Sequence, residues 1–192
     1  MSNAPHGAGK SSFDLIDAES LLDDLEPLAR RTLLDLGCGD GSYSLALSER
    51  AGPQGLVHAV DAWEEGIQEL QQRMAEESIE LDAPIHTHIA DASQGLPLPK
   101  NSVDLCLMAT VLHDIIQGGG HDKALAEIFR VLRPEGTLAV VEFDKVEDTP
   151  GPPLHIRLSQ EDLREFLQAR GFGVTGIIPH APPLYLAICR PM

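Results

Sequence analysis

The strongest constraint on the fold is the segment TLLDLGCGDGS, residues 32–42. A short apolar run ends at Asp35, and glycines follow at every second position, at Gly37, Gly39 and Gly41. A helix-compatible run comes next, so the pattern predicts a strand, a tight turn and a helix. Glycine permits positive φ and a close approach of a ligand to the backbone. In open α/β sheets, nucleotides and cofactors bind at such turns; a tight turn without a ligand is the simpler alternative.

A second acid strengthens the prediction of a ligand site. The apolar run LVHAVDAW contains Asp61 near its end, 20 residues after Gly41. An acid at roughly this distance closes the second strand of a dinucleotide-binding unit and binds ribose hydroxyls. A carboxylate suits this task because it accepts from both vicinal hydroxyls, and ionised acceptors form the stronger hydrogen bonds. The alternative is that Asp61 caps the helix that follows it.

Length and composition predict one globular domain. A chain of 192 residues can bury a sizeable core, and 43% hydrophobic with 23% charged residues is ordinary for a globular protein. We expect a flexible leader over residues 1–16 and a single domain over residues 17–192. The leader lacks the apolar core of a signal peptide. No apolar run is long enough to predict insertion into a membrane.

Charge and cysteine usage exclude other classes of function. Acids outnumber bases 30 to 14, for a net charge of −16, which argues against a nucleic-acid partner. Cys38, Cys106 and Cys189 lie far apart and show no metal-binding spacing. We therefore expect structural thiols in the reducing cytoplasm. His86 and His88 share a sheet face, but without a third ligand they predict no metal site.

Hydrophobic periodicity predicts alternating strands and helices. A first helix is expected over residues 17–25, and the last helix follows a capping box formed by Ser159 and Asp162. Only PHAPP separates the last two strands, so they should pair as an antiparallel hairpin. The result is βαβ alternation with an antiparallel finish. The seven expected strands cover residues 32–36, 57–60, 85–91, 102–110, 137–143, 172–178 and 184–189.

Together, these motifs resemble those of a known family. From about residue 33 to residue 186 the chain is similar to class I S-adenosylmethionine-dependent methyltransferases of the small-molecule type, in the ubiquinone/menaquinone-biosynthesis methyltransferase-like (type 11) group. The matching segments are LDLGCGDG, the acid Asp61, the loop ADAS, the fourth-strand region LPLPKNSVDLCLMATVLHDI, and EIFRVLRPEGTLAVVEF. The combination is more specific than any single motif.

The resemblance implies a Rossmann-like α/β three-layer sandwich. Its seven-stranded sheet has the order 3-2-1-4-5-7-6, with strand 7 antiparallel. S-adenosylmethionine would lie across the carboxyl ends of strands one, two and four and leave as S-adenosylhomocysteine. The implied cofactor-binding residues are Asp35, Gly37, Cys38 and Gly39 around the methionine part, Asp61 on the ribose, Ala62 or Trp63 on an adenine face, Asp91 and Ala92 at the adenine edge, and Ala109 near the methionine amine.

Three residues are candidates for acid–base chemistry. His113 and Asp114 follow the fourth strand, where the sheet opens onto the ligand, and His155 lies in the segment GPPLHIRLS. A histidine titrates near neutral pH and therefore suits proton removal from a methyl acceptor. The alternative for His113 is a histidine that only packs or hydrogen-bonds at a strand end. For His155 the alternative is an ordinary surface position in a loop.

Three functions compete at this point. The leading prediction is methyl transfer to a small-molecule acceptor. A second is an S-adenosylmethionine-binding protein without catalysis, and a third is a nicotinamide-dependent oxidoreductase domain. The absence of glycine at position 42 and the antiparallel finish argue against the third. We expect a small-molecule substrate, a monomer or homodimer, and no partner of nucleic acid.

Overall fold

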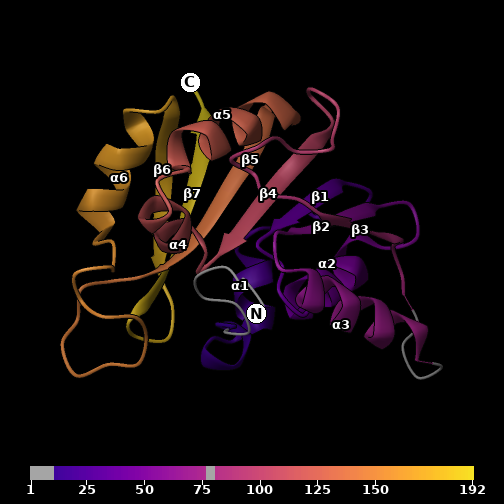
Figure 1. The fold of residues 1–192 in the computed structure, drawn as a ribbon, viewed down its shortest axis with the longest axis horizontal. Helices are drawn as coiled ribbons and strands as arrows, with labels where there is room; N and C mark the ends of the chain where they lie inside the picture. The colour runs from indigo at the N-terminus through magenta and orange to yellow at the C-terminus, as the bar shows by residue number, and fades with distance from the viewer. Residues whose placement is uncertain (1–10, 77–80) are drawn as a thin grey trace.

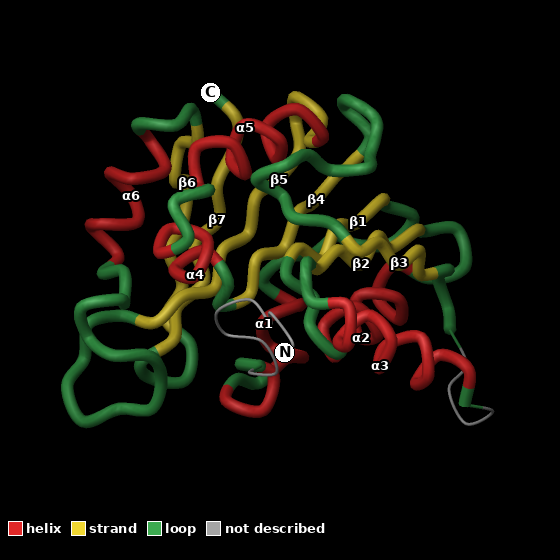
Figure 2. Tube along the Cα trace, in the orientation of Figure 1, coloured by secondary structure: helices red, strands yellow, loops and turns green. Residues whose placement is uncertain are grey.

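The computed structural model describes residues 11–76 and 81–192. In this part of the chain, one sheet lies between two layers of helices (Figure 1). Figure 2 shows the strands as a continuous layer. The strands are β1 (Thr32–Leu36), β2 (Leu56–Asp61), β3 (Ile85–Ile89), β4 (Val103–Ala109), β5 (Leu132–Phe143), β6 (Phe172–Pro179) and β7 (Leu184–Pro191). The helices are the 3-10 turn η1 (Phe13–Leu15), α1 (Ala18–Asp23), α2 (Ser42–Ala51), α3 (Glu64–Ala75), α4 (Leu112–Gln117), α5 (His121–Val131) and α6 (Gln160–Gln168).

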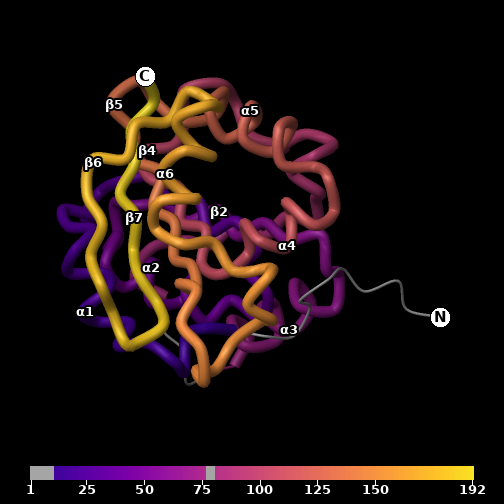
Figure 3. Tube along the Cα trace, turned by 90° about the vertical axis from the view of Figure 1, so that its left-hand side faces the viewer, coloured from indigo at the N-terminus to yellow at the C-terminus, as the bar shows by residue number. Residues whose placement is uncertain are grey.

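The order of the strands is β3-β2-β1-β4-β5-β7-β6, which confirms the predicted topology. Strands β1 to β5 run parallel, and β7 is antiparallel to both β5 and β6. In Figure 3 the β6–β7 hairpin lies at the left, with α6 beside it. Because β1 to β5 are parallel, their carboxyl ends meet along one border of the sheet and their amino ends along the opposite border. Ligand sites in such sheets lie at the carboxyl border.

Two hydrophobic clusters hold the layers together, one on each face of the sheet. Successive residues of a strand point to opposite faces, so Leu33 of β1 enters one cluster and Leu34 the other. Leu47 of α2 packs in the first cluster, which α1 and α3 also cover. Leu125 of α5 packs in the second cluster, together with α4 and α6. Burial on both faces explains the near-continuous apolar runs of the central strands.

The structure differs from the sequence prediction at two places that matter for the site. The predicted leader covers residues 1–16; residues 1–10 lie outside the described part of the chain, but residues 11–16 pack against the domain. Ser12 is 2% exposed, and the ring of Phe13 lies 5.0 Å from that of Tyr43. The second difference is α4, which the periodicity did not predict. Within residues 11–76 and 81–192, no helix is long and apolar enough to cross a membrane.

Candidate functional site

The glycine turn joins β1 to α2, and its three glycines have different surroundings. All have positive φ, at 76° for Gly37, 53° for Gly39 and 80° for Gly41. A Cβ on Gly37 would lie 2.5 Å from Val111, and one on Gly41 would lie 2.3 Å from Leu70. A Cβ on Gly39 would meet nothing within 4 Å. Two glycines therefore allow close packing behind the turn, whereas Gly39 leaves open space in front of it.

Asp61, the last residue of β2, links this turn to α3. Its Oδ2 accepts a hydrogen bond from the Gly39 N–H at 2.8 Å, and its Oδ1 accepts from the Trp63 N–H at 2.7 Å. Burial raises the pKa of Asp61, and these backbone N–H groups oppose the rise. A carboxylate has about four acceptor sites, so capacity remains for ligand hydroxyls. The carboxylate thus supports the turn and the entry to α3, and it stands where the ribose acid was predicted.

Asp35 lies on β1 beneath the turn and is 1% exposed. The Ser44 hydroxyl donates to its Oδ2 at 2.6 Å, which ties the strand to α2. Burial raises the pKa of Asp35 to about 7, with smaller contributions from Asp61 and Asp40 in the same direction. The contact with Ser44 holds the end of β1 against the start of α2, directly beneath the turn.

A cavity lies in front of the turn, which we call the turn cavity. It encloses about 90 Å³. The residues that line it come from the N-terminal segment, the glycine turn, α2, α3 and the end of β4. They are Ser11, Gly37, Cys38, Gly39, Asp40, Tyr43, Trp63, Glu69 and Ala109.

The N-terminal segment is fastened beside this cavity by hydroxyl groups. Ser12 Oγ lies 3.2 Å from the Tyr43 hydroxyl, and Thr110 Oγ1 donates to Ser12 Oγ at 3.2 Å. Thr110 follows β4 directly and has a φ of 55°. These bonds connect the segment, α2 and the end of β4 around one opening.

His113 lies in the first turn of α4 and is 6% exposed. Its backbone N–H donates to Glu142 Oε1 at 3.0 Å, and its ring Nδ1 lies 2.9 Å from Glu142 Oε2. Glu142, near the end of β5, is fully buried. The ring Nε2 lies 3.6 Å from Asp114 Oδ2. A histidine held this way by a carboxylate has a fixed ring orientation, because the backbone and the ring bind the same acceptor.

Comparison with known proteins places this geometry in a family. A family model described as "Methyltransferase domain" matches residues 34–140, which is more than half of the chain. The chain belongs to this methyltransferase family. A solved structure of a SAM-dependent methyltransferase from Aquifex aeolicus is 25% identical, with a TM-score of 0.84 over 94% of this chain and 93% of that one. The methyltransferase therefore has the class I, S-adenosylmethionine-dependent fold that its motifs resemble.

Two further comparisons concern the matched length of the methyltransferase and the range of reactions found with its fold. The ubiquinone/menaquinone biosynthesis C-methyltransferase of Hydrogenovibrio crunogenus is 35% identical over 114 residues, or 59% of this chain. The chain spans only 42% of that relative's length. A solved structure of the [4+2]-cyclase SpnF is also 25% identical, with a TM-score of 0.67 over 91% of this chain and 63% of that one. The fold thus occurs in a protein named for another reaction.

The structure brings five of the predicted cofactor residues of the methyltransferase into the lining of the turn cavity: Gly37, Cys38, Gly39, Trp63 and Ala109. Asp35 and Asp61 support the turn through the hydrogen bonds above. Asp91 is exposed after β3, where its Oδ1 accepts from the Ser93 N–H at 2.8 Å. Ala62 is exposed and Ala92 packs in the second core cluster. The roles of these residues toward a ligand stay predictions.

The surroundings of the three candidates for acid–base chemistry differ from those that the sequence suggested. The sequence placed His113 after the fourth strand; in the structure it lies in the first turn of α4 and is nearly buried beside Glu142. Asp114 follows it in α4. His155 lies exposed in the loop between β5 and α6, and its ring makes no polar contact with a described residue. Arg157 holds that loop by donating to the carbonyls of Val146 and Pro152, both at 2.8 Å.

Sequence reasoning missed several residues around the turn cavity. Tyr43 and Glu69 line it. Their positions could have identified them, because Tyr43 lies in the first turn of the helix after the glycine turn and Glu69 lies on the helix after Asp61. Ser11 and Ser12 gave no local signal in a polar leader. Glu142 ends an apolar strand in the segment TLAVVEF. A carboxylate at the carboxyl end of a buried strand is the same signal that identified Asp35 and Asp61, and it would have found Glu142.

Proposed function

We propose that the chain transfers the methyl group of S-adenosylmethionine to a small-molecule acceptor. The observation that carries the proposal is Gly39, whose missing side chain leaves open space beside the turn cavity. Asp61 binds the N–H of that same residue, so the ribose acid and the open backbone are held together. Such a combination at the carboxyl border of a parallel sheet supports a nucleoside ligand.

The charges around the turn fit this cofactor, which carries a positive sulfonium and an amino group. Asp35, Asp40 and Asp61 surround the turn; burial raises the pKa of Asp35, and repulsion from the other two carboxylates raises it further. A bound cation relieves that repulsion. When bound, the cofactor supplies an activated methyl group. The residues that would hold it are Gly37, Cys38, Gly39 and Ala109 along the methionine part, Asp61 at the ribose, and Ala62, Trp63, Asp91 and Ala92 around the adenine.

The turn cavity has to open when this ligand enters. Sites for small organic ligands usually hold about 300–1,000 Å³, and the turn cavity encloses about 90 Å³. Ser11 and Tyr43 belong to its lining, and the hydroxyl bonds of Ser12 fasten the N-terminal segment there. We infer that this segment moves on binding and then excludes water from the reacting groups.

His113 is the proposed proton acceptor for substrates that need one. Glu142 accepts from the backbone N–H and lies within hydrogen-bond distance of Nδ1, which orients the ring with Nε2 on the Asp114 side. A base needs its own atom within about 2.6–3.2 Å of the atom that carries the proton, or one bridging water, so an acceptor has to come close to the start of α4. His155, on its exposed loop, is a second candidate for contact with the acceptor.

Calorimetry tests the proposal directly. Titration with S-adenosylmethionine, S-adenosylhomocysteine and NAD should give binding of the first two alone; binding of NAD alone would overturn the proposal. Transfer of a radiolabelled methyl group to a panel of phenols, amines, thiols and quinones then separates an enzyme from a protein that binds the cofactor without catalysis. Cytoplasmic location, a small-molecule rather than nucleic-acid partner, and a monomeric or dimeric state are part of the same proposal.

A further inference from the structure

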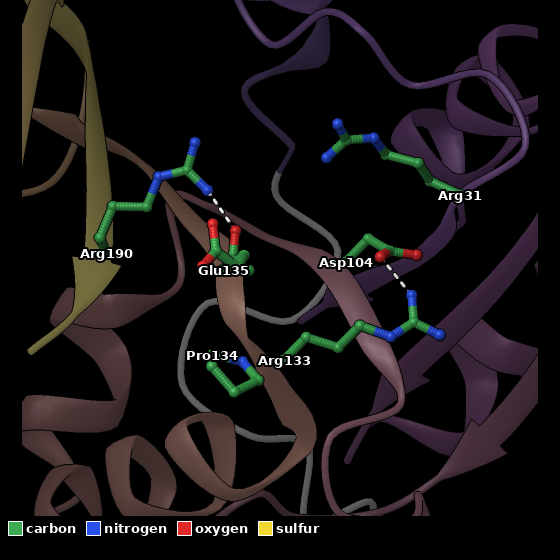
Figure 4. Close-up of a pocket in the computed structure, with 7 residues that line it drawn as sticks. Arg31, Asp104, Arg133, Pro134, Glu135 and Arg190 are labelled. Atoms are coloured by element: carbon green, nitrogen blue, oxygen red, sulfur yellow. Dashed lines mark hydrogen bonds and ion pairs between the residues drawn. The ribbon is translucent and has the colours of Figure 1, made fainter.

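A second cleft lies at the amino border of the sheet, opposite the glycine turn. We call it the arginine cleft, because Arg31, Arg133 and Arg190 line it together with Asp104 and Glu135 (Figure 4). These residues come from the adjacent strands β1, β4, β5 and β7, with Arg31 immediately before β1. The cleft has a volume of about 740 Å³, within the range usual for small-ligand sites.

The acid at the base of the cleft is already engaged. Asp104 Oδ2 accepts from the Thr32 backbone N–H at 2.8 Å, and Oδ1 forms an ion pair with Arg133. This carboxylate therefore fixes the start of β1 and positions one guanidinium. Its charge is balanced within the protein and offers little to compete with a bound anion.

The other two arginines keep most of their donors. Arg190 donates one N–H to the backbone carbonyl of Glu135, and the Arg31 side chain makes no polar contact with any described residue. Each guanidinium carries five N–H donors. In Figure 4 both guanidinium groups are directed toward the same opening. Because Asp104 neutralises Arg133, the remaining charges of the cleft are two guanidinium groups, on Arg31 and Arg190, and one carboxylate, on Glu135.

We propose that the arginine cleft binds a phosphate-bearing small molecule, with Arg31 and Arg190 as its principal ligands. Planar guanidinium groups match the oxygens of a phosphate in pairs. The chain has a net charge of −16, so two neighbouring arginines without an ion pair to any described residue are a local exception to its negative electrostatic potential. The cleft is separated from the turn cavity by the length of the strands, so an occupant does not compete with the methyl donor.

Inorganic pyrophosphate is the probe, because its two phosphates can span two guanidiniums, and ATP tests whether an organic group adds affinity. Calorimetry at low salt should show pyrophosphate binding that Arg31→Gln and Arg190→Gln each weaken about tenfold. Arg30→Gln removes the same charge one residue away, outside the cleft, and should leave the affinity unchanged. No binding at millimolar pyrophosphate, or an equal loss in all three variants, would overturn the proposal.

A gain of affinity provides a test that misfolding cannot imitate. Glu135→Gln removes the opposing carboxylate but keeps the carbonyl that accepts from Arg190, so pyrophosphate should bind severalfold more tightly. An unchanged or weakened affinity contradicts the assignment. Binding of S-adenosylhomocysteine, measured on the same variants, should stay at the wild-type value. The two proposals can therefore be rejected independently, because binding of pyrophosphate and binding of S-adenosylhomocysteine are measured separately on each variant.

Discussion

The two borders of the parallel sheet carry opposite unpaired charges. At the carboxyl border Asp35, Asp61 and Asp91 form no ion pair with any described residue and are held by hydroxyl or backbone N–H groups instead. At the amino border Arg31 lacks a polar partner among the described residues. Unpaired charges that a fold keeps near a cavity are candidates for ligand contacts. The two proposals thus assign a cation to one border of the domain and an anion to the other.

The two borders differ in how strongly their charges act. Asp35 is removed from water, and burial raises its pKa to about 7. Arg133 and Arg190 are exposed, so salt screens their interactions over about 10 Å at 0.1 M. Changes at the carboxyl border should therefore have the larger effects and depend little on salt. Changes at the amino border should be smaller and disappear at high salt.

The largest expected effect is the loss of cofactor binding in Gly39→Val. The new side chain occupies the open space in front of the turn, and we expect affinity for S-adenosylhomocysteine to fall by about a hundredfold or more. Gly52→Val is the matched control, since Gly52 also has a positive φ, 66°, with nothing within 4 Å of its Cβ. Both variants should lose stability alike in thermal melts, and calorimetry should show lost binding only in Gly39→Val. Equal affinities would mean that no ligand crosses this turn.

The next effect concerns turnover. We expect His113→Ala to lower kcat by about a hundredfold while cofactor affinity stays nearly intact. Glu142→Gln should lower kcat as well and change its pH profile, because Nδ1 loses its carboxylate. Glu165→Gln removes an exposed acid from α6 and serves as the control.

Kinetics separate this role from a structural one. If His113 only shapes the pocket, KM for the acceptor rises while kcat holds. If the pair only stabilises the fold, both variants melt earlier and the folded fraction keeps its wild-type kcat.

Asp61→Ala should weaken cofactor binding by roughly ten- to a hundredfold, the value of a lost charged hydrogen bond. It should also lower the melting temperature, because Gly39 and Trp63 lose an acceptor for their N–H groups. Ser159→Ala is the reference for a purely structural loss, since that hydroxyl accepts from the Asp162 N–H in a capping box. A helix cap is worth about 1 kcal/mol. If Asp61→Ala behaves like Ser159→Ala, with stability lost and affinity kept, Asp61 is only a cap.

The smallest effect on ligand binding comes from Asp35, whose ionisation also makes stability depend on pH. Its pKa is about 7 in the folded protein and 3.8 for an ordinary aspartate, so the folded state binds an extra proton at pH values between these two. The free energy of unfolding therefore falls as pH rises from about 4 to 7, and the contribution is lost above 7. Asp35→Asn should flatten this decline in denaturant titrations.

The same group should affect cofactor affinity in the opposite direction. A cationic ligand binds more tightly as Asp35 becomes negatively charged. The dissociation constant for S-adenosylmethionine should therefore fall by about threefold to tenfold between pH 6 and pH 8. Asp35→Asn should remove the change. A slope that persists in this variant assigns the titration to another group.

Most of the fold could be predicted from the sequence. All seven strands were found because most are short apolar runs bounded by turn residues, and β1 matches its predicted bounds. β5 is longer than predicted: it begins at Leu132, directly after α5, because Leu132 pairs with Val103 across the sheet. The helix α4 was missed although Leu112, Ile115 and Ile116 have helical spacing. A six-residue helix gives too few turns for a periodic signal.

The local sequence is enough to predict the first strand, the glycine turn, the helix after it and the acid at the end of the next strand. These depend on neighbouring residues and on backbone conformations that glycine alone adopts readily. Three contacts could be seen in the folded structure alone: Glu142 with His113, Ser12 with Tyr43, and the shared cleft of the arginines beside β1 and on β5 and β7. Their meeting depends on strand order and register, which bring together residues that no local pattern relates. The order and direction of the strands therefore place the turn cavity at the carboxyl border and the arginine cleft at the amino border.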